Sequence, residues 1–141
     1  MIYLGPLQNT VASNKQNTAD MAHILVVDDS PTERHFISKL LEQTGHKVST
    51  ADSGEEGVEV AKDIHPDLIL MDIVMPGMNG FQATRQITTS PETAEIPVVM
   101  VSTKSQQTDK VWATRQGAKG YLVKPVNSEM LINSIKSFLA A

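Results

Sequence analysis

Charged and hydroxyl side chains come at the ends of four short apolar runs in this sequence. The runs are HILVV, LILM, PVVMV and YLV. The side chains that follow them are three carboxylates, two hydroxyls and one ammonium: Asp28, Asp29, Asp72, Ser102, Thr103 and Lys124. Alone, each would be an ordinary turn residue or a solvated surface charge. Their chemistry therefore depends on whether the fold brings them to one place.

Gathered together, these groups are suited to binding a divalent cation and transferring a phosphoryl group. Three carboxylates held close repel one another, and a cation relieves that repulsion. Oxygen ligands without His or Cys favour Mg²⁺. An Asp carboxylate can attack phosphorus to give an aspartyl phosphate. A metal ion and a Lys can then neutralise the charge on the transferring group.

The apolar runs alternate with amphipathic segments, and this pattern predicts five strand–helix units. We expect strands at 23–27, 47–51, 68–71, 97–101 and 121–123. Strands that read as unbroken apolar runs are buried on both faces, as in a parallel sheet covered by helices. We therefore predict the α/β class, a doubly wound (βα)5 fold with a five-stranded parallel sheet between helices. Ligands of such sheets bind outside the carboxyl ends of the strands, where all the groups named above would lie.

Capping patterns predict where the helices begin. Ser30 can cap the first helix, Pro31 suits its first position, and Glu33 is expected to complete a capping box. A second Ser-to-Glu pattern opens the next helix, where Glu55 and Glu56 are interpreted as acidic residues favoured by the helix dipole. The four His residues show no ligand spacing and are interpreted as bystanders: His23, His35, His46 and His65.

Length and composition exclude several classes of protein. The 141 residues suit one domain, and 40% are hydrophobic against 20% charged. A net charge of −4 argues against a nucleic-acid partner. Cys is absent, and no apolar run approaches the ~18 residues of a membrane span. We expect a cytoplasmic protein without membrane insertion, with residues 1–20 a disordered leader or extension and 21–141 the folded domain.

Three other functions were weighed against phosphoryl acceptance. A phosphatase with a nucleophilic Asp in the first strand needs a second carboxylate two residues later, but Ser30 and Pro31 occupy those positions. A nucleotide-binding protein needs a Gly-rich loop after that strand, and no Gly is present there. A binding module that never uses phosphate stays open, although the complete acidic, hydroxyl and Lys set argues against it.

Four longer stretches resemble the receiver domain of bacterial response regulators, which has a flavodoxin-like, CheY-like fold. They are VVDDSPTERHFISKLLEQTGH, LILMDIVMPGMNGFQATRQI, IPVVMVSTKSQ and GAKGYLVKPV. The resemblance covers about residues 22–141 in unbroken order. Within the family, DDSPTE, MDIVMPG and TDKVW resemble a branch that regulates type IV pilus twitching motility. Flagellar chemotaxis and an intermediate phosphorelay step remain alternatives.

The resemblance implies a role for each acidic residue. It makes Asp72 the phosphoacceptor, and Asp28 and Asp29 the pair that binds Mg²⁺. The backbone carbonyl of Val74 would be the third protein ligand of the ion. Because Val74 has no polar side chain to orient a hydrolytic water, and Lys104 stands two residues after Ser102, we expect slow self-dephosphorylation.

The resemblance also implies how the signal is passed on. Ser102 and Lys124 would contact the phosphoryl group, the bond from Lys124 to Pro125 would be cis, and Tyr121 would be the switch aromatic. A CheA-like histidine kinase would supply the phosphoryl group. A target protein would read the face formed by residues 106–139, which carries Trp112 as core packing or as a partner contact. With no output domain expected, the protein is not a turnover enzyme.

Overall fold

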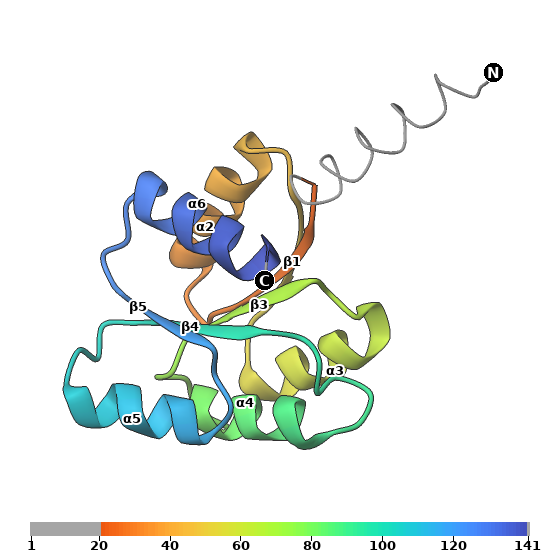
Figure 1. Ribbon diagram of the computed structural model, residues 1–141, viewed down its shortest axis with the longest axis vertical. Coiled ribbons are helices and arrows are strands. Elements are labelled where there is room, and N and C mark those ends of the chain that lie inside the picture. The colour runs from red at the N-terminus through yellow and green to blue at the C-terminus, as the bar shows by residue number, and fades with distance from the viewer. Residues whose placement is uncertain (1–20, 141) are drawn as a thin grey trace.

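The computed structural model describes residues 21–140, which form a parallel sheet between two layers of helices (Figure 1). The predicted leader, residues 1–20, lies outside the described residues. The strands are β1 (His23–Val27), β2 (Lys47–Ala51), β3 (Leu68–Met71), β4 (Val98–Ser102) and β5 (Gly120–Val123). The helices are α2 (Pro31–Gln43), α3 (Gly54–Ile64), α4 (Gly80–Thr89), α5 (Gln107–Arg115) and α6 (Ser128–Ala140). Among residues 21–140, no helix has the length and apolar character needed to cross a membrane.

The sheet has the strand order β2-β1-β3-β4-β5, and every neighbouring pair is parallel. This confirms the doubly wound (βα)5 fold predicted from the alternating pattern. The chain leaves β1 toward one edge to form β2 and then returns to the other side of β1 for β3. The order therefore reverses between β1 and β3, where ligands of open α/β sheets bind.

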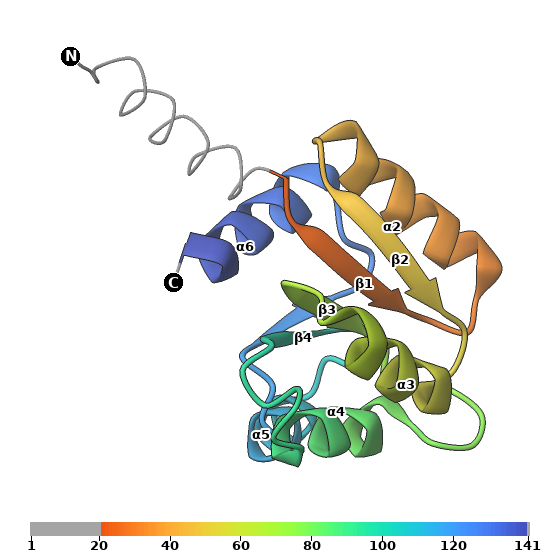
Figure 2. The same ribbon diagram turned by 90° about the vertical axis from the view of Figure 1, so that its right-hand side faces the viewer.

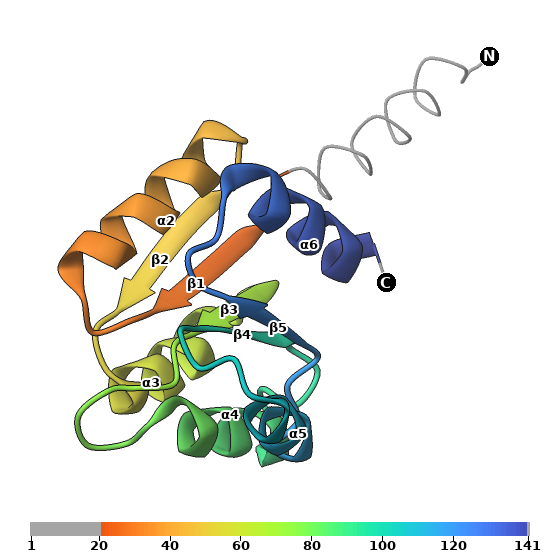
Figure 3. The same cartoon turned by 90° about the vertical axis from the view of Figure 1, so that its left-hand side faces the viewer.

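Two apolar cores lie on opposite faces of the sheet. Helices α2 and α6 cover one face, and α3, α4 and α5 cover the other (Figures 2 and 3). Within β1, Ile24 and Val26 belong to the first core, whereas Leu25 and Val27 belong to the second. Successive side chains of a strand point to opposite faces, so a strand covered on both sides must be apolar throughout. The apolar runs in the sequence are unbroken because both faces of these strands are buried.

The start of α2 differs from the predicted capping box. Ser30 Oγ accepts the Glu33 N–H at 3.3 Å, as expected. The Ser30 N–H, however, donates to Asp28 Oδ1 at 2.9 Å, so the return bond from Glu33 does not form. The Glu33 carboxylate instead pairs with Lys124. The capping-box prediction for Glu33 was wrong because a buried carboxylate and a distant ammonium compete for the two groups.

The next two helices are capped in different ways. At α3, Ser53 Oγ accepts the Glu56 N–H at 3.0 Å, and the Glu56 carboxylate accepts from the Asp52 N–H at 2.7 Å, one residue before the cap. At α4, Asn79 and Gln82 exchange side chain to backbone bonds at 2.9 Å and form a complete capping box. Each cap fixes where its helix begins relative to the sheet edge.

Gly80, the first residue of α4, lies directly against the backbone that follows β3. Its N–H donates to the Ile73 carbonyl at 2.9 Å. A Cβ at this position would lie 1.9 Å from the Asp72 carbonyl oxygen and 2.8 Å from Ile73 Cα. The backbone atoms of Asp72 and Ile73 leave no room for a side chain, so glycine allows the helix to approach this closely.

We therefore expect Gly80→Ala to lower the free energy of unfolding by about 2 kcal/mol, because overpacking against backbone cannot be relieved by a rotamer change. Urea denaturation followed by circular dichroism measures this. Gln86→Ala, exposed in the same helix, is the matched control and should change stability by less than ~0.5 kcal/mol. Equal stability of the two variants would contradict the close packing at Gly80.

Candidate functional site

Backbone hydrogen bonds continue the parallel ladder past the strand ends and hold the backbone of the site. Three such bonds join Asp28 N to Ala51 O at 3.1 Å, Asp72 N to Val27 O at 2.9 Å and Lys124 N to Ser102 O at 2.8 Å. Side chains that are 96 residues apart in the chain, Asp28 and Lys124, are thereby placed on one rigid edge.

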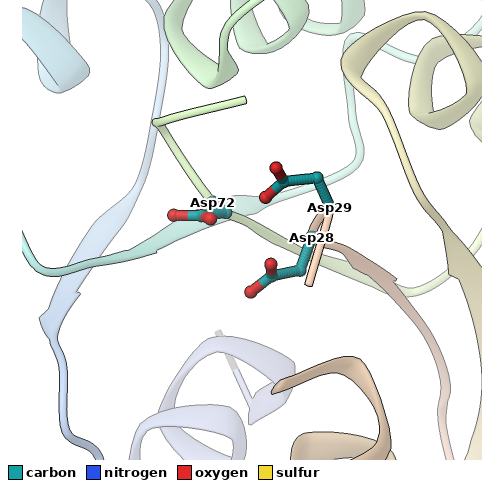
Figure 4. A group of neighbouring side chains, drawn as sticks. All are labelled: Asp28, Asp29 and Asp72. Carbon is teal, nitrogen blue, oxygen red and sulfur yellow. The ribbon is translucent and has the colours of Figure 1, made fainter. Parts of the chain in front are cut away.

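Three carboxylates gather at the ends of β1 and β3 (Figure 4). Asp28, Asp29 and Asp72 each offer one oxygen, and these oxygens all lie within 4.8 Å of one another. Asp28 and Asp72 are buried, whereas Asp29 is exposed, so the cluster opens to solvent on the Asp29 side. None of the four His residues belongs to it. An all-oxygen donor set of this kind is what a hard divalent cation requires.

The Asp28 carboxylate is fully engaged by its surroundings. Its Oδ1 accepts the Ser30 N–H at 2.9 Å, and its Oδ2 accepts from Lys124 Nζ at 3.0 Å. The Asp28 carbonyl accepts from Arg34 Nη1 at 2.7 Å. Arg34, one turn into α2, is a site residue that no sequence motif indicates; only its place near the start of a helix that follows β1 points to it.

Asp72 lies beside the ammonium but is held mainly by its own backbone. Its Oδ1 accepts the Ile73 N–H at 2.8 Å, and its Oδ2 lies 3.7 Å from Lys124 Nζ. Burial raises the pKa of Asp72 to about 6, with the negative charges of Asp28 and Glu33 adding to the effect and Lys124 opposing it. The neighbouring carboxylates thus make a second or third negative charge costly in the absence of a cation.

Lys124 supplies the positive charge of the site. Its side chain is only 10% exposed, and its ammonium contacts Asp28 at 3.0 Å and also pairs with Glu33. Burial alone would lower the pKa of Lys124, but hydrogen bonds to Glu33 and Asp28 and the attraction of Asp72 hold it above its usual value. The bond between Lys124 and Pro125 is cis. The lysine is therefore protonated in this pocket.

Ser102 and Tyr121 both bond to Lys104, in the loop after β4. Ser102 is buried, and its Oγ accepts the Lys104 N–H at 3.2 Å. The Tyr121 hydroxyl donates to the Lys104 carbonyl at 2.7 Å. Burial, followed by the charge of Asp109, raises the pKa of Tyr121. Thr103, the second predicted hydroxyl, is exposed.

Two further residues lie in the loop after β3 or contact it. The Val74 side chain, two residues after Asp72, is apolar and 58% exposed. Glu55 accepts the Met78 N–H at 3.2 Å and so ties the start of α3 to this loop. The sequence predicts only a helix-dipole role for Glu55, because nothing local to α3 indicates a contact 23 residues away.

The raised pKa of Asp72 predicts a pH-dependent effect of neutralising it. Since its folded pKa lies above the ordinary value of 3.8, the stability associated with its protonated form is present below about pH 4 and lost as pH rises through about 6. In metal-free protein, Asp72→Asn should raise the free energy of unfolding by about 1–3 kcal/mol at pH 8, and the gain should vanish toward pH 4.

Urea denaturation in EDTA across this pH range measures the difference between wild type and Asp72→Asn. The exposed Asp63, in α3, provides a matched control, and Asp63→Asn should stay within ~0.5 kcal/mol of wild type throughout. A gain from Asp72→Asn that is the same at pH 4 and pH 8 would contradict the electrostatic cause.

Comparisons with known proteins agree with this geometry. Residues 24–136 match the family model of the response regulator receiver domain. The chain is 57% identical over 120 residues to protein PilH of Pseudomonas aeruginosa, covering 85% of this chain and 99% of PilH. It also resembles the chemotaxis protein CheY4 of Vibrio cholerae, with 33% identity, 84% and 98% coverage and a TM-score of 0.80.

A third relative is the receiver domain of the sensor histidine kinase PA1611 from Pseudomonas aeruginosa. It is 26% identical, with a TM-score of 0.80 over 86% of this chain and 99% of its own, and its structure holds a magnesium ion in the active site cleft. The family match, the strand order and the acidic cluster point the same way. This chain belongs to the response regulator receiver domain family and is closely related to PilH.

Proposed function

We propose that this protein accepts a phosphoryl group on Asp72 from a CheA-like histidine kinase and signals through contact with another protein. The observation that carries the proposal is the meeting of the Asp72 carboxylate with two further carboxylates and one ammonium at the sheet edge. An attacking carboxylate, charge-neutralising groups and an open side are what phosphoryl transfer to a protein requires.

Mg²⁺ is the ion we propose for the acidic cluster, held by Asp28, Asp29, Asp72 and the backbone carbonyl of Val74. The donor set consists of oxygen atoms, with Asp28 buried, Asp72 largely buried and Asp29 exposed to water, which suits an ion that keeps several waters. The magnesium ion in the PA1611 receiver domain supports this choice. When bound, Mg²⁺ would neutralise charge on the transferring phosphoryl group.

The chain's own residues account for the rest of the transfer. A carboxylate oxygen of Asp72 forms a bond to phosphorus as the bond from phosphorus to the donor's imidazole nitrogen breaks, and that nitrogen leaves with the electron pair. The Lys124 ammonium, 3.7 Å from Asp72 Oδ2, is close enough to meet the new phosphoryl oxygens after a small movement. Ser102 offers a hydroxyl donor from the end of β4.

Signalling would follow from a change in the bonds around Ser102. If Ser102 turns to the phosphoryl group, it gives up the Lys104 N–H, and Tyr121 can leave its bond to the Lys104 carbonyl. The populations of the conformations of the face formed by α5, β5 and α6 would then shift. A target protein would bind one of these conformations. Trp112, on α5 and 48% exposed, is a candidate contact on that face.

The proposed pathway is type IV pilus twitching motility in the cytoplasm, supported by the 57% identity to PilH. A chemotaxis-type or phosphorelay-intermediate role is the alternative. The similarity to the chemotaxis protein CheY4 supports the chemotaxis-type role. The two differ in the kinase that phosphorylates the protein fastest, so one transfer experiment separates them.

The test is phosphotransfer from each histidine kinase of the source organism to wild type, Asp72→Asn and the control Asp63→Asn, with Mg²⁺ or with EDTA. We expect radiolabel on wild type and on the Asp63→Asn control with Mg²⁺, and none on Asp72→Asn, because the amide lacks the attacking oxygen anion. The fastest donor should be a CheA-like kinase. Equal labelling of Asp72→Asn would show that Asp72 is not the acceptor.

The exposed apolar side chain of Val74 predicts a long-lived phosphoprotein. With no polar group there to orient a water toward the phosphorus, self-dephosphorylation in Mg²⁺ should have a half-life of minutes or longer. Val74→Asn, which adds a polar side chain at the same place, should shorten it. Loss of label from purified phosphoprotein measures both, and a wild-type half-life of seconds would contradict the prediction.

A further inference from the structure

Glu33 reaches the phosphoryl site from the first turn of α2. Its backbone N–H is capped by Ser30, but its side chain is not used by the cap. The carboxylate lies instead against the Lys124 ammonium. The Glu33 side chain is 46% exposed, whereas that of Lys124 is 10% exposed. A fourth carboxylate thus contacts the single ammonium of the site from the solvent side.

The contacts of Lys124 are unequal. Its ammonium has three N–H donors, and the structure places Asp28 at 3.0 Å and Glu33 in direct contact. Asp72 Oδ2, at 3.7 Å, is beyond hydrogen-bond distance. The ammonium therefore lies closer to the α2 side of the site than to the proposed phosphoacceptor.

A phosphoryl group on Asp72 would add strong acceptor oxygens that compete for this ammonium. The third N–H of the ammonium can bond one of them, but the ammonium has to move toward Asp72 Oδ2, 3.7 Å away, and this movement stretches its contacts with Asp28 and Glu33. Asp28 is 2% exposed, so water cannot replace the hydrogen bond that it would lose with Lys124. Glu33 is half-exposed and can be rehydrated by solvent when it lets go. Glu33 is therefore the partner that Lys124 can give up at low cost.

We propose, resting on the proposed function, that Glu33 is a positioning residue which holds Lys124 on the α2 side in the unphosphorylated protein and releases it to the phosphoryl group. Since this contact is given up on phosphorylation, it stabilises the unphosphorylated state. Glu33 thus slows phosphoryl acceptance by acting through Lys124, without touching the reacting atoms itself.

The test measures the rate of phosphorylation by acetyl phosphate in Mg²⁺, because this small donor needs no docking surface. Glu33→Gln keeps the size of the side chain and removes its charge. We expect it to be phosphorylated about two- to fivefold faster than wild type, the range set by loss of one partly exposed ion pair. Mass spectrometry of the intact protein follows the reaction, and thermal denaturation checks that each variant is folded.

Glu33→Asp separates the contact from the general charge of the site. This variant keeps the negative charge but is one methylene shorter, which draws the carboxylate away from Lys124. If the contact acts, Glu33→Asp speeds phosphorylation as Glu33→Gln does. If only net charge mattered, Glu33→Asp would keep the wild-type rate, and that result would overturn the proposal. Glu42→Gln, exposed at the far end of the same helix, should leave the rate unchanged.

The outcomes also separate this inference from the proposed function. If wild type does not react with acetyl phosphate, the fastest kinase replaces acetyl phosphate as the donor. Wild type that takes a phosphoryl group from neither donor overturns the proposed function, and the role of Glu33 with it. Wild type that is phosphorylated at Asp72, with Glu33→Gln reacting at the same rate or more slowly, overturns the role of Glu33 alone.

Discussion

The repulsion among carboxylates at the ends of β1 and β3 is the constraint on which the rest of the site depends. Asp28, Asp29 and Asp72 present oxygens within 4.8 Å of one another, two of the three residues being buried. Left alone, such a cluster would disfavour the folded state. Lys124 offsets part of this cost through its contact with Asp28. The remaining negative charge favours the binding of a cation.

The sheet supplies the rigidity that this crowding requires. The carboxylates are anchored by ladder hydrogen bonds rather than by flexible loops, and both faces of the sheet are packed with apolar side chains. At the buried start of α4, Gly80 lets the helix approach the Asp72 backbone more closely than any other residue would allow. The like charges stay close together because the hydrogen-bonded and packed sheet prevents the backbone that carries them from moving apart.

Sequence reasoning reached most of the fold and the composition of the site. Hydrophobic periodicity located every strand of the described chain to within one residue, since this signal is local. The convergence of Asp28, Asp72 and Lys124 followed from topology, because parallel strands end at one edge. The role of Glu33 was missed for a physical reason. Its local partner, the Ser30 N–H, is taken by Asp28, and its actual partner is distant in the chain.

The two bonds to Lys104 join the ends of the proposed switch through one residue. Its N–H holds Ser102 and its carbonyl holds Tyr121, so a turn of this single stretch of backbone changes both. Such sharing makes the coupling reciprocal. The free energy that the site gains when Ser102 leaves the Lys104 N–H can weaken the bond from Tyr121 to the Lys104 carbonyl. Equally, a target protein that binds when Tyr121 is loose lends the same free energy to the modified site. Binding of the target protein would thereby stabilise the phosphorylated form of the site.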